Sequence, residues 1–157
     1  MEIYLDTNII IGWFKNMKKS IKRGEDFREP KKLEFLRSQD FKLHTSSLTK
    51  AEVFRYLKSD WGSKSSESIN LWKDFIRDYR IIELKEQINI DYGQICDICL
   101  NVNLGRKTII NLIHLQFAKW MNLIFLSGDK PITDRLKDYF DNTMTYIKLR
   151  QVTGNAS

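Results

Sequence analysis

The sequence predicts an α/β fold, a three-layer α/β/α sandwich with a mainly parallel central sheet. Short apolar segments of strand length alternate with longer segments at helical spacing along almost the whole chain, which is typical of parallel sheets covered by helices. The run Leu123–Leu126 is continuously apolar, as in strands buried on both faces. A length of 157 residues suits one core, so we expect a single domain over residues 1–150 and a flexible tail at 151–157.

The first half of the chain contains two strand-to-helix transitions. Residues 1–5 form an apolar run short enough for a strand, and Ile9–Phe14 is long enough to begin a helix. Phe41–Thr45 alternates with a period of two and predicts a second strand. The other expected elements are a charged loop at 15–30, a helix at 31–38, an amphipathic helix at 51–58, a polar loop at 59–68 and a helix at 71–79.

The second half continues the alternation. Arg80–Leu84 is a short strand candidate, and residues 108–121 are apolar almost all round, which predicts a central, buried helix. Two further segments complete the pattern, a helix at 88–102 and a strand at 144–149.

Two cysteines, Cys96 and Cys99, lie within the helix expected at 88–102, far in sequence from both histidines. A zinc site needs about four ligands, and a disulfide framework needs more cysteines. We therefore expect both thiols to be small buried apolar groups on the apolar side of this helix.

Charge and hydropathy limit the class of protein. The formal net charge is +6, and residues 15–37 hold nine Lys/Arg against four Asp/Glu. This excess favours polyanionic partners through counterion release, although a solvated surface explains it equally well. No segment reaches the roughly 18 apolar residues of a membrane span, and Glu2 and Asp6 stand where a signal peptide is basic. We expect a cytoplasmic protein without membrane contact.

Three acidic residues follow predicted strands. Asp6 ends the first strand, Glu52 lies in the first turns of the helix after the second strand, and Asp129 follows the run ending at Leu126. Parallel strands with right-handed crossovers present their carboxyl ends at one edge of the sheet. Clustered carboxylates repel one another unless a cation neutralises them, which implies Mg²⁺ or Mn²⁺. Such ions activate water and stabilise charge on phosphate, so the expected reaction is phosphodiester hydrolysis.

Each acid also has a purely structural interpretation. Asp6 could cap the helix beginning near Asn8. Glu52 follows Thr49 by three residues, which is the spacing of a capping box. Asp129 lies in a segment with the composition of an ordinary turn.

Three segments together resemble the PIN-domain family, small metal-dependent ribonucleases that include the VapC-type toxins. These segments are Tyr4–Asn8, Ser46–Glu52 and Phe125–Asp129. The resemblance implies that Asp6, Glu52 and Asp129 hold the divalent metal. It also implies a second group of polar residues that orient carboxylates, water or the substrate phosphate: Thr7, Asn8 and Ser127.

The chain departs from the family pattern at one position. The family has an Asp at the start of the buried helix, eighteen residues before the last acid, and this chain has Asn111 there. The predicted catalytic set is therefore Asp6, Glu52, Asn111 and Asp129. An amide oxygen can still contact a metal or its water but carries no charge, so weaker binding and slower hydrolysis are expected. A natural low-activity form, an introduced substitution, and compensation by Asp97 or Asp134 all remain open.

The resemblance also implies a substrate and partners. PIN-like nucleases cut RNA, here single-stranded or structured RNA, and Arg106, Lys107 and Lys130 flank the predicted site as phosphate contacts. Solvated surface charge is the alternative role for these three residues. Trp13, Trp61 and Trp72 are at helical spacing, so we assign them to the core rather than to base stacking. VapC-type toxins imply a homodimer and a small antitoxin protein.

The leading functional hypothesis is a metal-dependent endoribonuclease, the VapC-like toxin of a toxin–antitoxin pair. The alternative is a catalytically weakened PIN domain that binds RNA or acts as a scaffold, with Asn111 as its main support. A phosphatase with an aspartyl nucleophile is disfavoured, because such enzymes need a second acid two residues after the first and Asn8 stands there.

Overall fold

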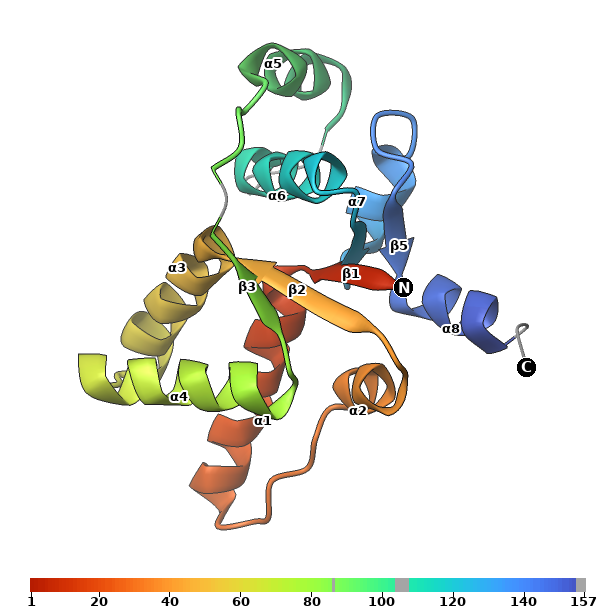
Figure 1. Ribbon diagram of the computed structural model, residues 1–157. Helices are drawn as coiled ribbons and strands as arrows, with labels where there is room; N and C mark the ends of the chain where they lie inside the picture. The colour runs from red at the N-terminus through yellow and green to blue at the C-terminus, as the bar shows by residue number, and fades with distance from the viewer. Residues whose placement is uncertain (86, 104–107, 155–157) are drawn as a thin grey trace. The chain divides into compact units, whose positions relative to one another are not determined.

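The computed structural model describes residues 1–85, 87–103 and 108–154, and it divides into two compact units, Met1–Lys85 and Glu86–Ser157 (Figure 1). Every strand pairing described below is parallel. The predicted α/β class with a parallel sheet is therefore confirmed.

The first unit is a three-stranded sheet with its helices. β1 lies beside β2 and β2 beside β3, with Tyr4 opposite His44 and His44 opposite Ile82. The four α-helices of this unit lie on the same side of the three strands (Figure 1). Its elements are β1 (Glu2–Leu5), α1 (Thr7–Arg23), α2 (Lys31–Ser38), β2 (Lys42–Ser46), α3 (Ser47–Tyr56), a short π-helical turn η1 (Leu57–Trp61), α4 (Ser65–Asp78) and β3 (Ile82–Leu84).

An aromatic cluster joins α1 to α4. The Trp13 ring lies 4.8 Å from that of Phe14 and 5.1 Å from that of Phe75, and Phe75 lies 4.9 Å from Tyr79. Burial of each such side chain contributes about 2 kcal/mol. Trp13 and Trp72 are both buried, so the prediction that they belong to the core is confirmed.

Two loops predicted in the first unit are shorter than expected. Residues 15–23 continue α1, because Lys, Met and Ile are compatible with a helix interior and no Gly or Pro occurs between Lys15 and Arg23. Gly24 ends the helix with a φ of +64°, which glycine adopts without steric cost. The loop predicted at 59–68 is confined to residues 62–64, between η1 and α4.

The second unit contains a pair of parallel strands, with Phe125 opposite Thr143. The strand predicted at 144–149 is wrong beyond Thr145, because Thr145 Oγ1 accepts a hydrogen bond from the Lys148 N–H and a helix begins there. That helix includes residues 151–154 of the predicted tail, while 155–157 lie outside the described residues. The elements are α5 (Tyr92–Asn101), α6 (Thr108–Trp120), β4 (Ile124–Ser127), α7 (Lys130–Arg135), β5 (Thr143–Thr145) and α8 (Tyr146–Gly154).

The burial predicted for α5 is wrong. Only Ile95 and Ile98 of this helix are buried, and both cysteines are free and exposed. Leu100 is 86% exposed. Ile95 and Ile98 are three residues apart and lie on the same face of the helix. Because this face is directed inward, both cysteines lie on the outward side.

The prediction for α6 is confirmed in part. Residues 112 and 114–118 are buried, but Ile109 and Trp120 near its two ends are exposed. In the part of the chain that the structure describes, no helix combines the length and the apolarity needed to cross a bilayer.

Candidate active site

Asp6 lies where β1 gives way to α1. It occupies the N-cap position of α1, yet its side chain makes no capping hydrogen bond, so the interpretation as a helix cap is wrong. Its carboxylate is almost fully buried and accepts a hydrogen bond from the Asn8 side-chain amide, with Nδ2 2.6 Å from Oδ2. Asn8 therefore restrains the orientation of the Asp6 carboxylate.

Glu52 lies within α3, after the first turn of that helix, which has Ser46 as its N-cap and contains Thr49. The Thr49 N–H donates to Ser46 Oγ at 3.4 Å, so Ser46 is the cap and Glu52 does not form a capping box with Thr49. Glu52 Oε2 instead accepts a hydrogen bond of 2.5 Å from the hydroxyl of Thr7, which is the first residue of α1. This bond joins the start of α1 to α3 across 45 residues of sequence.

Tyr4 connects β1 to the end of β2 and to the first turn of α3. Its hydroxyl is buried, 2.6 Å from Ser46 Oγ and 3.2 Å from Thr49 Oγ1. Burial, with a smaller contribution from the negative charges of Asp6 and Glu52, raises the pKa of Tyr4 to about 12. Both carboxylates therefore act on one buried hydroxyl, at one edge of the first unit. Nothing in the apolar run 1–5 distinguishes Tyr4 from a core residue, so the sequence did not reveal this role.

The donor chemistry of this edge fits a hard divalent cation. Asp6 and Glu52 supply carboxylate oxygens, the ligands that Mg²⁺ and Mn²⁺ favour, and each is oriented by a neighbouring side chain. Among the described residues, no group of three or more His, Cys, Asp or Glu side chains is arranged to hold a metal ion. The first unit thus contributes a two-carboxylate set.

Asp129 and Asn111 belong to the second unit. Asp129 is half-buried at the N-cap position of α7, makes no side-chain cap, and donates its backbone N–H to Ser127 Oγ at 2.9 Å. Ser127 is fully buried at the end of β4 and shapes the turn that carries the acid. Asn111 is half-buried in the first turn of α6. Asp129 therefore follows β4, Ser127 ends that strand, and Asn111 lies in the first turn of α6.

The side chains predicted to contact phosphate lie outside the part of the chain that the structure describes. Arg106 and Lys107 are outside the described residues. Lys130 is the first residue of α7, and its side chain is likewise outside what the structure describes.

A charged network that sequence reasoning did not single out lies beside α3. Lys50 Nζ is 2.9 Å from Glu83 Oε1, and the Trp72 indole N–H donates to Glu83 Oε2 at 3.0 Å. Burial alone raises the pKa of Glu83, but the hydrogen bonds from Trp72 and Lys50 outweigh it and lower the pKa below its usual value. The network joins α3 and α4 to β3.

Comparisons with known proteins give a match of structure but not of sequence. No protein-family model matches the chain, and no curated protein matches it. A chain of VapBC-1 from nontypeable Haemophilus influenzae superposes with a TM-score of 0.62 at 23% identity, covering 94% of this chain and 100% of that one. A chain of VapBC2 from Rickettsia felis, solved bound to a DNA fragment from their promoter, gives a TM-score of 0.59 at 17% identity, covering 92% and 97%.

These similarities extend over nearly the full length of both chains, while their sequence identities are low. They establish the fold and confirm the structural side of the predicted resemblance. The chain has the fold of a VapC-like PIN domain.

Proposed function

We propose that this protein is a metal-dependent endoribonuclease and the toxin of a VapBC-type toxin–antitoxin pair. The observation that carries the proposal is the pair of oriented carboxylates at the edge of the first unit, Asp6 held by Asn8 and Glu52 held by Thr7. Oriented oxygen ligands at the carboxyl ends of parallel strands are suited to a hydrolytic metal site. The PIN fold supports the same reaction class.

The proposed ion is Mg²⁺ or Mn²⁺, with Asp6, Glu52 and Asp129 as its protein ligands. When bound, such an ion supplies positive charge for the phosphate and makes a water molecule more acidic. Asn8 and Thr7 keep the carboxylates of the first unit in fixed orientations. Asn111 contributes a neutral amide oxygen where the family pattern has a third negative charge, so we propose a lower rate of hydrolysis.

The proposed substrate is RNA, and the proposed protein partners are an antitoxin and a second copy of this chain. The net charge of +6 supports a polyanionic substrate. Arg106, Lys107 and Lys130 are proposed as phosphate contacts, and Ser127 as a residue that shapes the substrate side of the site. The antitoxin proposal is supported by the fold that the chain shares with chains of VapBC complexes.

A second candidate function is RNA binding without cleavage. One observation favours it, Asn111 in place of an acid. The two candidates differ in whether the protein breaks a phosphodiester bond.

A cleavage assay on mixed RNA with Mg²⁺ or Mn²⁺, repeated in chelator, separates them. Asp6→Asn and Glu52→Gln are expected to reduce metal-dependent cleavage by more than about a hundredfold. Asp40→Asn, an exposed acid between α2 and β2, is the matched control and should leave the rate unchanged. Cleavage that survives in chelator contradicts the metal mechanism, and RNA binding without cleavage by the unaltered protein supports the second candidate.

A further inference from the structure

The first unit contains a pocket of about 460 Å³ that neither Asp6 nor Glu52 lines. This volume is within the range of small-molecule sites. Five of its ten lining residues are charged, and the other five form an aromatic and aliphatic wall: Trp13, Met17, Phe27, Leu71 and Tyr79. Such a wall suits a planar, largely apolar group.

Trp13 provides a hydrogen-bond donor in this pocket. The side chain is 4% exposed, and its indole N–H makes no hydrogen bond of ordinary geometry, although it lies close enough to the Tyr79 hydroxyl to lower the pKa of that group. A buried donor without a well-formed hydrogen bond is costly, and such groups in native proteins call for an explanation. A ligand with a carbonyl or ring-nitrogen acceptor would satisfy it. The Trp13 ring meets Phe27 edge to face, with centroids 5.2 Å apart.

The charged residues that line the pocket are three acids, Glu29, Asp74 and Asp78, and two arginines, Arg37 and Arg77, most of them joined in ion pairs. Glu29 accepts a hydrogen bond from Arg37 at 2.7 Å and another from the Tyr79 hydroxyl. Burial and the neighbouring Glu29 raise the pKa of Tyr79, which keeps its hydroxyl neutral. Arg77 is paired with Asp74 at 3.0 Å and with Asp78 at 3.1 Å. The interior therefore favours a neutral ring over an ion.

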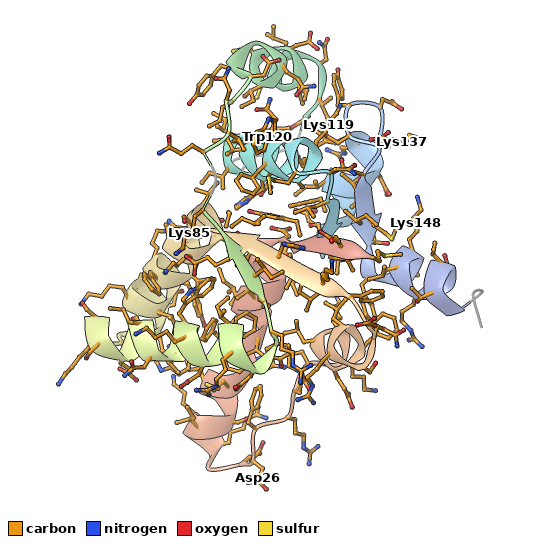
Figure 2. The ribbon with its side chains drawn as sticks, in the orientation of Figure 1. Asp26, Lys85, Lys119, Trp120, Lys137 and Lys148 are labelled. Carbon is orange, nitrogen blue, oxygen red and sulfur yellow. The ribbon has the colours of Figure 1, made fainter. Side chains whose placement is uncertain are left out.

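A polar hollow of about 360 Å³ is lined by other residues of two segments that also line the aromatic pocket. On α1, Trp13 and Met17 face the pocket while Lys19 and Arg23 face the hollow. On the connection from α1 to α2, Phe27 lines the pocket, and Asp26 and Arg28 line the hollow. Figure 2 shows Asp26 on that connection, directed away from the strands. Three cationic side chains, Lys19, Arg23 and Arg28, and two acidic ones, Glu25 and Asp26, line the hollow. The cationic side chains are in excess, which suits a phosphate.

We propose that the pocket and the hollow form a nucleotide subsite for single-stranded RNA. An unpaired base stacks against the aromatic walls and accepts a hydrogen bond from the Trp13 N–H, while a flanking phosphate contacts Lys19, Arg23 and Arg28. Unpaired bases held on aromatic side chains are the usual basis of single-strand recognition. The choice of RNA rests on the proposed function. The 17 residues of α1 extend about 25 Å, so the hollow, at the last turns of α1, lies far from Asp6 at its first.

Nuclear magnetic resonance of the full chain in chelator tests the base contact directly. The probes are a pentaribonucleotide with one central adenine and abasic sugars elsewhere, and its fully abasic counterpart. The Trp13 indole N–H resonance, assigned by its loss in Trp13→Phe, should shift with the adenine probe and not with the abasic one. We expect the adenine probe to bind about tenfold more tightly.

Two variants separate the base contact from the phosphate contact. Phe27→Ala changes a side chain that is 38% exposed, so the variant should fold, and it should weaken the adenine probe about tenfold without affecting the abasic probe. Arg23→Gln should weaken both probes and reduce the slope of log K against log salt by about 0.7. Lys73→Gln, an exposed lysine on α4, is the control and should leave the preference for adenine unchanged.

An indole resonance that does not move at saturating RNA overturns the subsite, as do equal affinities of the two probes. A shift produced only by a phenylalanine-containing peptide also overturns it and assigns the pocket to a protein partner. The cleavage assay tests the proposed nuclease activity independently of these binding measurements. Cleavage with unaltered binding by Phe27→Ala refutes only the subsite, whereas adenine-dependent binding without cleavage refutes only the nuclease.

Discussion

Replacing Tyr4 by phenylalanine removes one buried hydroxyl from the first unit. The variant loses the contacts to Ser46 Oγ at 2.6 Å and to Thr49 Oγ1 at 3.2 Å, and both partners are buried. Each hydrogen bond contributes about 1 kcal/mol net, and an unsatisfied buried hydroxyl adds to the cost. We expect the free energy of unfolding to fall by about 2 kcal/mol, which lowers the midpoint of thermal unfolding by about 6 °C.

Urea unfolding followed by circular dichroism measures this loss. Tyr92→Phe is the matched control, because Tyr92 is 64% exposed and belongs to the second unit. Its stability should stay within about 0.5 kcal/mol of that of the unaltered protein. If Tyr4→Phe proved equally stable, the two hydrogen bonds would contribute nothing net, and the link between β1 and α3 would have to come from packing alone.

The same variant carries a pH prediction. The folded protein raises the pKa of Tyr4 from 10.0 to about 12, so folding favours the neutral hydroxyl. That contribution is fully present below pH 10 and is lost as the pH rises through 12. Its full size is roughly 2–3 kcal/mol. Tyr79 titrates in both proteins, so the measurement is the difference between them, which should close between pH 10 and 12. A constant difference over that range would refute the shift.

Three further predictions follow from the site and the surface. Asn111→Asp restores a negative charge and should raise both Mn²⁺ affinity and cleavage rate by about tenfold; unchanged values of both would place position 111 outside the site. The lowered pKa of Glu83 gives a contribution to stability that is present above pH 4.5 and lost on further acidification, so the advantage of the unaltered protein over Glu83→Gln in acid unfolding should shrink below that pH. Cys96 and Cys99 are exposed and should both react with a thiol reagent in the native state; protection of either thiol would contradict the orientation of α5.

The strand ends that carry the acids were predictable because they depend on local pattern. An apolar run of strand length followed by Asp, and a period-two segment followed by a capped helix, identify Asp6 and Glu52 without tertiary information. The alternative interpretations, in which Asp6 caps a helix and Glu52 belongs to a capping box, were also plausible from sequence. Only the coordinates show that Ser46 caps α3 and that Asp6 makes no cap.

The remaining features depend on contacts between distant residues. Tyr4 looks like any core residue of β1, and its polar role exists only because β2 places Ser46 beside it. The orientation of α5 follows from which apolar residues find a partner, and its helical period alone allows either face. The cationic stretch after Phe14 favours solvent exposure but does not exclude a helix, which is why α1 is longer than predicted.

The hydrogen bonds that Thr7 and Asn8 donate have a consequence for the affinity of the proposed metal ion. A flexible carboxylate loses rotational freedom when it coordinates an ion, but these two side chains have lost much of it on folding. The first turn of α1 is therefore a preorganising element, and two consecutive residues align acids that come from different helical segments. Thr7→Val would leave both ligands in the chain and still weaken ion binding, by restoring disorder to Glu52.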